Sequence, residues 1–197
     1  MLFRSKMHAN PFPSSKNRSK KLLELVHTDV HKVGATTHSG YQYWVTFIDD
    51  YSRFRIVLLI KTKDMVFDAF KQFKAYAGNQ TGHKIKALRD DKGGEYMSNA
   101  FLRFTDECGI IRQHTVRNRP QQNGVAECAN RTLSESIMAM LEESGLSSKF
   151  WGECLAALVH VWNRCPMSAV SKKTPFELWH GKKPDVSHLC PSVVVVV

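Results

Sequence analysis

The sequence lacks any long hydrophobic run. Its longest apolar runs, such as residues 56–60 and 193–197, are far shorter than the ~20 residues needed to cross a bilayer. Met1, Leu2 and Phe3 are followed closely by Arg4 and Lys6, so the N-terminus has no apolar core of a signal peptide. We therefore expect an intracellular protein that is neither secreted nor inserted in a membrane.

Cysteine pairs are also absent. The five cysteines are odd in number and none are spaced as CxxC; they are Cys108, Cys128, Cys154, Cys165 and Cys190. This pattern excludes a disulfide framework and indicates a reducing compartment. Two zinc sets can be assembled, His188 with Cys190 or Cys154 with His160 and Cys165, but neither has the usual ligand spacing. We interpret these side chains as core or surface residues.

Acidic residues are scarce relative to basic ones. Lys and Arg number 28 against 18 Asp and Glu, which gives a formal net charge of +10 in a chain of 197 residues. The length suits one domain, and 43% hydrophobic residues exclude wholesale disorder. A basic surplus of this size favours a polyanionic partner, most often nucleic acid.

Short β-rich runs and helical periodicities follow one another along the chain. We predict strands over residues 22–29, 43–48, 55–60, 85–88 and 110–114, with the second and third joined as a hairpin. Apolar residues spaced by three and four predict helices over 66–77, 98–108, 125–143 and 149–163. Strands first, then strands alternating with helices, predict an α/β fold with a mixed sheet and helices packed against it.

The two ends differ in composition from the middle. Residues 1–21 are basic and interrupted by prolines, and we interpret them as an arm, either a solvated tail or a segment for nucleic-acid binding or nuclear import. Residues 191–197 are a valine-rich tail of uncharged β-formers, which is an aggregation hazard. The folded core is expected to span residues 22–190.

Three acids fall where catalytic sites form in such folds. Asp29 ends the first predicted strand, Asp91 follows the fourth, and Glu127 lies in the first turn of a predicted helix. Converging carboxylates need cations between them, and oxygen-only ligands select Mg²⁺ or Mn²⁺. Two such ions ~4 Å apart support phosphodiester transfer. The alternative is three surface acids that do not converge.

The segment around Glu127 is suited to phosphate. Asn130 and Arg131 follow three and four residues later, so they share its helix face. The preceding loop has no acid before Glu127 and carries Arg112, Arg117, Arg119, Gln121, Gln122 and Asn123. These side chains suit phosphate positioning and adaptable base contacts. The alternative for the helix is an ordinary amphipathic helix with a Glu–Arg pair.

Several sequence motifs go further than these patterns. Asp29, Asp91 and Glu127, with 35 residues between the last two, resemble the D,D-35-E triad of retroviral and retrotransposon integrases. The surrounding motifs resemble the copia-type group: His27-Thr28-Asp29-Val30, Phe47-Ile48-Asp49-Asp50-Tyr51-Ser52-Arg53, Gly93-Gly94-Glu95-Tyr96, Pro120-Gln121-Gln122-Asn123-Gly124-Val125-Ala126-Glu127, Asn130-Arg131-Thr132, Asn163-Arg164 and Lys173-Thr174-Pro175-Phe176-Glu177-Leu178-Trp179. The likeness runs from about Pro11 to Leu189.

The resemblance implies a ribonuclease H-like fold, which is a five-stranded mixed sheet flanked by helices. The catalytic core and its C-terminal helical extension would together span residues 22–190. It implies an integrase that trims DNA ends and transfers them into target DNA. Asp29, Asp91 and Glu127 would hold two Mg²⁺ or Mn²⁺ ions, and the chain would self-associate on paired DNA ends in the nucleus. The expected DNA contacts are Lys92, Arg117, Arg119, Gln121, Gln122, Asn123, Asn130 and Arg131. Asp49 and Asp50 are expected to have a structural or capping role.

This sequence departs from the family pattern in several places. Lys92 stands where the family generally has Asn, Cys128 where it has a basic residue, and Asp90 where it often has Ser. Lys92 either weakens metal binding by repulsion or binds phosphate. Only residues 6–13 resemble the linker that follows the family's zinc-binding module, so we expect a fragment of a polyprotein. Two hypotheses follow: a metal-dependent polynucleotidyl transferase, or a catalytically inactive relic that only binds nucleic acid.

Overall fold

The computed structural model describes residues 18–114, 124–170 and 172–189. Its centre is a five-stranded sheet in the order β3-β2-β1-β4-β5. The strands are β1 (Val26–Lys32), β2 (Tyr43–Asp49), β3 (Arg55–Ile60), β4 (Ala87–Asp90) and β5 (Ile111–His114). β1, β2 and β3 pair antiparallel, whereas β4 pairs parallel with both β1 and β5. The predicted five-stranded mixed sheet is confirmed.

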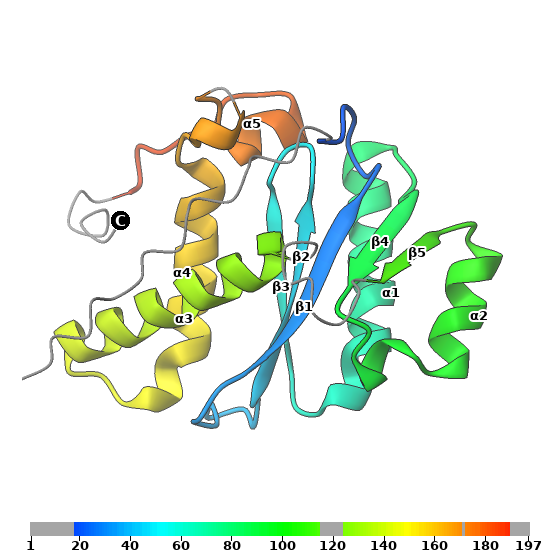
Figure 1. Ribbon diagram of the computed structural model, residues 1–197. Coiled ribbons are helices and arrows are strands. Elements are labelled where there is room, and N and C mark those ends of the chain that lie inside the picture. Colours follow the sequence, from blue (N-terminus) through cyan, green and yellow to red (C-terminus); the bar gives the residue numbers. More distant parts are fainter. Residues whose placement is uncertain (1–17, 115–123, 171, 190–197) are drawn as a thin grey trace, which may run out of the picture.

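Helices cover both faces of this sheet (Figure 1). On one side lie α1 (Val66–Thr81) and α2 (Asn99–Glu107), and on the other lie α3 (Gly124–Ser144) and α4 (Trp151–Arg164). The short α5 (Pro175–His180) places Trp179 in a stack on Phe54, with ring centroids 4.8 Å apart. None of the described helices is both long and apolar enough to cross a membrane.

Two hydrophobic clusters hold the layers together. The larger lies under α1, where Phe70, Phe73 and Ala77 recur at helical spacing and Phe47 of β2 stacks on Phe73 at 4.4 Å. The second lies between the sheet and the α3–α4 pair, around Trp44 and Trp151. Both faces of the sheet are therefore packed against helices.

The first strand differs from the prediction. We expected residues 22–29 to form it, but β1 runs from Val26 to Lys32, and Leu22 and Leu23 lie in a turn. Leu23 has a φ of 60°, is fully buried and donates its backbone N–H to Asp49 Oδ1 at 2.8 Å. The strand continues past Asp29 because it pairs with β2 as far as Lys32, opposite Tyr43. Asp29 is therefore mid-strand, not at the strand end.

Little of the two predicted end segments can be placed. Of the arm over residues 1–21, only residues 18–21 are described, and the tail over residues 191–197 lies outside the described residues. The Arg18 guanidinium donates to the backbone carbonyls of Asp50, Tyr51 and Ala169. This arginine thus joins the start of the described chain to the β2–β3 turn and to the segment after α4.

Candidate active site

Asp29 lies in the middle of the sheet, on β1, and is half-buried. Its Oδ2 accepts a hydrogen bond from Asn130 Nδ2 of α3 at 2.9 Å. Burial raises the pKa of Asp29 to about 6; the Asn130 hydrogen bond opposes this rise, and the negative charges of Asp91 and Glu127 add to it. The carboxyl group thus faces two other acids in a poorly solvated position.

Asp91 immediately follows β4, as predicted, and is exposed. Its Oδ1 accepts the Gly93 backbone N–H at 2.9 Å, which closes a tight turn. A Cβ at position 93 would lie 2.8 Å from Glu95 Oε2 and 3.1 Å from Asp91 Oδ1. A larger residue at position 93 would therefore make the Glu95 side chain shift and would crowd the Asp91 carboxylate.

Glu127 lies in the first turn of α3, as predicted, where the helix dipole favours a carboxylate. Its side chain is exposed, yet burial and the negative charge of Asp91 both raise its pKa. Asp29, Asp91 and Glu127 therefore act on one another electrostatically, although they come from three separate segments.

The donor chemistry of this triad fits Mg²⁺ or Mn²⁺, since it consists only of carboxylate oxygens and carries mutual repulsion that a cation would relieve. In the present conformation, no three His, Cys, Asp or Glu side chains among the described residues are arranged to hold one metal ion.

The predicted DNA contacts fall into three groups. Lys92 and Arg131 are exposed, Lys92 directly after Asp91 and Arg131 one turn after Glu127. Asn130, in contrast, is buried. Its Oδ1 accepts hydrogen bonds from Trp44 Nε1 at 2.9 Å and from Thr46 Oγ1 at 2.5 Å, and its Nδ2 donates to Asp29 Oδ2. The remaining predicted contacts lie outside the described residues: Arg117, Arg119, Gln121, Gln122 and Asn123.

Asp49 and Asp50 have the predicted structural role. Asp49 accepts the backbone N–H groups of Leu23 and Ser52, and the Ser52 hydroxyl donates to it at 2.6 Å. Asp50 pairs with His27 Nε2 at 3.0 Å and with Arg53 Nη2 at 3.2 Å. Both carboxylates hold the β2–β3 turn, and both are buried.

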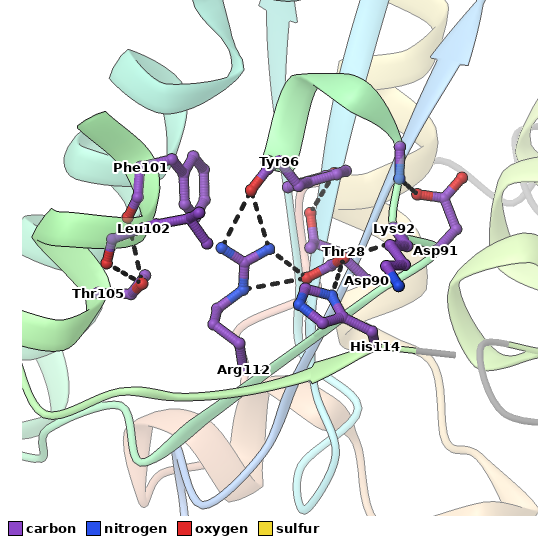
Figure 2. Close-up of polar contacts among 11 residues, drawn as sticks. Thr28, Asp90, Asp91, Lys92, Tyr96, Phe101, Leu102, Thr105, Arg112 and His114 are labelled. Atoms are coloured by element: carbon purple, nitrogen blue, oxygen red, sulfur yellow. Dashed lines mark hydrogen bonds and ion pairs between the residues drawn. The ribbon is translucent and has the colours of Figure 1, made fainter. Parts of the chain in front are cut away.

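A buried polar cluster beside Asp91 was not predicted from the sequence (Figure 2). Asp90 is fully buried and pairs with Arg112 and His114 of β5. We expected Arg112 to join the phosphate-facing arginines of the loop, but its side chain is 7% exposed and is engaged inside the protein. The sequence signal for this cluster was Asp90 itself, which stands where the related integrases often have Ser. An acid that is buried in the fold requires a cation nearby.

The four cysteines that the structure describes are not gathered with other metal-ligating side chains into a cluster. Cys108, Cys128, Cys154 and Cys165 are free thiols, and Cys190 lies outside the described residues. The structure places His160 against His188 instead, with their Nε2 atoms 3.1 Å apart on the surface of α4. The zinc set of Cys154, His160 and Cys165 is not brought together within the described part of the chain.

Comparison with known proteins agrees with this architecture. The integrase core domain family matches residues 20–120. The chain is 40% identical over 185 residues to the retrovirus-related Pol polyprotein from transposon TNT 1-94 of Nicotiana tabacum, covering 93% of this chain and 14% of that protein. It is 27% identical over 187 residues to the transposon RE2 polyprotein of Arabidopsis thaliana, covering 95% of this chain and 13% of that protein. The chain thus spans a small part of the curated relatives it matches.

Solved structures show the same fold at low sequence identity. The chain matches the simian T-cell lymphotropic virus intasome in complex with PP2A regulatory subunit B56 gamma, with a TM-score of 0.68, 16% identity and coverage of 89% of this chain and 61% of that chain. It matches the HTLV-2 integrase catalytic core domain in complex with magnesium with a TM-score of 0.63, 17% identity and coverage of 83% and 100%. The predicted ribonuclease H-like fold and the copia-type resemblance are confirmed. The chain belongs to the integrase core domain family.

Proposed function

We propose that this domain is a metal-dependent polynucleotidyl transferase that processes the 3′ ends of a DNA copy and joins them to target DNA. The observation that supports the proposal is the electrostatic coupling of Asp29, Asp91 and Glu127, which come from β1, the turn after β4 and the first turn of α3. These residues would hold two Mg²⁺ or Mn²⁺ ions. When bound, such ions activate the attacking oxygen and stabilise the leaving one.

The chain's own groups prepare the three acids for this task. Asn130 orients the Asp29 carboxylate from α3, and the Gly93 amide fixes Asp91 in its turn. Burial, with the negative charges of Asp91 and Glu127 added to it, raises the pKa of Asp29 to about 6, so the ionised carboxylate is costly there without a cation. Cation binding would therefore draw the three side chains together.

DNA is the proposed substrate and partner. Lys92, which follows Asp91, and Arg131, which lies one turn after Glu127, are exposed cations suited to phosphate contacts. Arg117, Arg119, Gln121, Gln122 and Asn123 are proposed to contact the DNA close to the reacting phosphodiester. One matched structure is an intasome and the other is a trimeric form, which supports self-association on DNA ends. Because the target is chromosomal DNA, we also propose a nuclear location.

The reverse reaction on a preformed branched DNA tests the proposal with the fewest requirements. Purified protein is incubated with labelled branched DNA and Mn²⁺, beside Glu127→Gln, in which an exposed side chain changes and the fold stays intact. Rejoined product from the parent alone is the expected result. Equal product from the variant would reject the assignment of Glu127 and of the two-metal site.

A second candidate function is sequence-indifferent nucleic-acid binding without catalysis. It is favoured by the Lys92 cation next to Asp91, which would repel a metal ion bound there. It predicts salt-sensitive DNA binding that does not change with Mn²⁺. A folded parent that binds branched DNA without rejoining it would support this candidate.

A further inference from the structure

We infer that Asp90 and Arg112 are positioning residues that fix the Asp91 turn for metal binding. The inference rests on the proposed function, because it assigns Asp91 as a metal ligand. Asp90 directly precedes Asp91, and Arg112 lies on β5, which pairs with the strand that Asp91 follows. They act through the backbone on which Asp91 is carried (Figure 2).

Both oxygens of the Asp90 carboxylate are fully used. Oδ2 accepts two hydrogen bonds from the Arg112 guanidinium, from Nε at 3.1 Å and from Nη2 at 2.5 Å. Oδ1 accepts the Lys92 backbone N–H at 2.9 Å and lies 2.9 Å from His114 Nδ1, which donates to it in the Nδ1-protonated tautomer. One buried carboxylate thus joins the end of β4, the turn that follows it and β5.

The bond from Lys92 to Asp90 spans Asp91. Lys92 has a φ of 63°, a left-handed conformation that a lysine adopts only when its surroundings enforce it. Two successive side-chain-to-backbone bonds enforce it here, from Lys92 N–H to Asp90 and from Gly93 N–H to Asp91. Without Asp90, the first of these bonds is lost and the backbone on both sides of Asp91 is released.

Arg112 extends the support to the first strand. Its Nη1 and Nη2 donate to the Tyr96 carbonyl at 3.2 and 3.3 Å, and its guanidinium lies over the Phe101 ring at 4.6 Å. The buried Tyr96 hydroxyl in turn lies 2.9 Å from Thr28 Oγ1, next to Asp29 in β1. The cluster therefore connects the backbone segments that carry Asp29 and Asp91.

Mn²⁺ binding in the absence of DNA tests this role independently of turnover. Asp90→Ala leaves the Arg112 charge buried without its partner, so the double variant Asp90→Ala/Arg112→Met is made as well, in which neither charge remains. Loss of a group that orients a metal ligand typically weakens metal binding 10- to 100-fold. We expect about a tenfold weaker Mn²⁺ affinity in both variants, measured by calorimetry, together with faster hydrogen exchange at Lys92 and Gly93.

Asn163→Ala is the matched control. Asn163 is also buried and ties α4 to β3 by accepting the Arg55 N–H at 2.9 Å and donating to the Arg55 carbonyl at 2.8 Å. Two strands, β2 and β1, separate β3 from β4 in the sheet. Loss of the Asn163 side chain lowers stability but leaves Mn²⁺ affinity unchanged. Parent-like affinity in the double variant, with binding lost in Asp91→Asn, would overturn the positioning role alone. Equal Mn²⁺ binding by parent and Asp91→Asn would overturn both the metal site and this inference.

Discussion

The side-chain amide of Asn130 joins three secondary-structure elements. From α3 it accepts hydrogen bonds from Trp44 and Thr46 of β2 and donates one to Asp29 of β1. It is 2% exposed, whereas its neighbour Arg131 is exposed. Two adjacent residues that the sequence suggests for the same DNA-facing role therefore have different surroundings.

This difference predicts that an alanine substitution at position 130 lowers stability, whereas one at position 131 lowers DNA affinity. Asn130→Ala should lower the free energy of unfolding by about 3 kcal/mol, because the Trp44 indole N–H and the Thr46 hydroxyl are left buried without an acceptor. Arg131→Ala should change it by less than about 0.5 kcal/mol and weaken DNA binding instead. Urea denaturation monitored by circular dichroism measures both. A destabilisation of Asn130→Ala no larger than that of Arg131→Ala would contradict the assigned role.

The three triad acids could be predicted from the sequence because their spacing and surrounding motifs are local properties. The supporting contacts could not. Asn130 accepts hydrogen bonds from Trp44 and Thr46, which precede it by 86 and 84 residues in the sequence. Asp90 pairs with Arg112, which follows it by 22 residues. Such hydrogen bonds depend on how strands and helices are brought together, which periodicity along the chain does not show.

The strands and helices were predicted well where apolar residues recur with a strong periodicity. They were predicted less well where a side chain distant in the sequence determines where a strand begins or ends. The β2–β3 hairpin and helices α1, α2, α3 and α4 are found close to the expected positions. Leu22 and Leu23 are apolar residues of the kind found in strands. The Leu23 backbone N–H, however, donates a hydrogen bond to the Asp49 carboxylate, and the chain turns at this point. At the other end, β1 continues beyond Asp29 because it stays paired with β2, where His31 also stacks on Trp44 at 4.3 Å.

Two neighbouring imidazoles connect α4 with the segment after α5. His160 of α4 and His188 lie with their Nε2 atoms 3.1 Å apart, so at least one ring must be neutral for a hydrogen bond to form. Partial burial and the positive charges of Arg164 and His188 lower the pKa of His160 below its ordinary 6.5. A lowered pKa in the folded state means that the contact is complete above about pH 6.5 and weakens as the pH falls.

We therefore predict that the segment over residues 182–189 separates from α4 on acidification. Hydrogen exchange of its amides should be faster at pH 5 than at pH 7.5 in the parent, after correction for intrinsic exchange rates. His188→Gln, which cannot gain a charge, should abolish most of this difference. A parent whose exchange protection is the same at both pH values would show that the histidine pair does not hold the segment.

Charge is distributed unevenly between the interior and the surface of the domain. Buried Asp90 and Asp50 are each paired with an arginine, Arg112 and Arg53, so these charges cancel inside the protein. The formal surplus of +10 is consequently carried by groups outside these pairs. In the predicted DNA-binding segment between β5 and α3, Arg117 and Arg119 are not accompanied by any acid.

DNA binding by the whole domain should therefore depend steeply on salt and little on DNA sequence. Each phosphate contact made by an arginine contributes about 0.9 to the slope of log affinity against log salt concentration. Arg117→Ala/Arg119→Ala should thus reduce the slope by about 2, for random and element-end duplexes alike, measured by fluorescence anisotropy. Lys71→Ala is the control, because Lys71 lies on α1, on the sheet face opposite α3, and pairs with Asp68 at 2.6 Å. An unchanged slope in the double variant would place the DNA elsewhere on the domain, since two lost phosphate contacts must reduce counterion release.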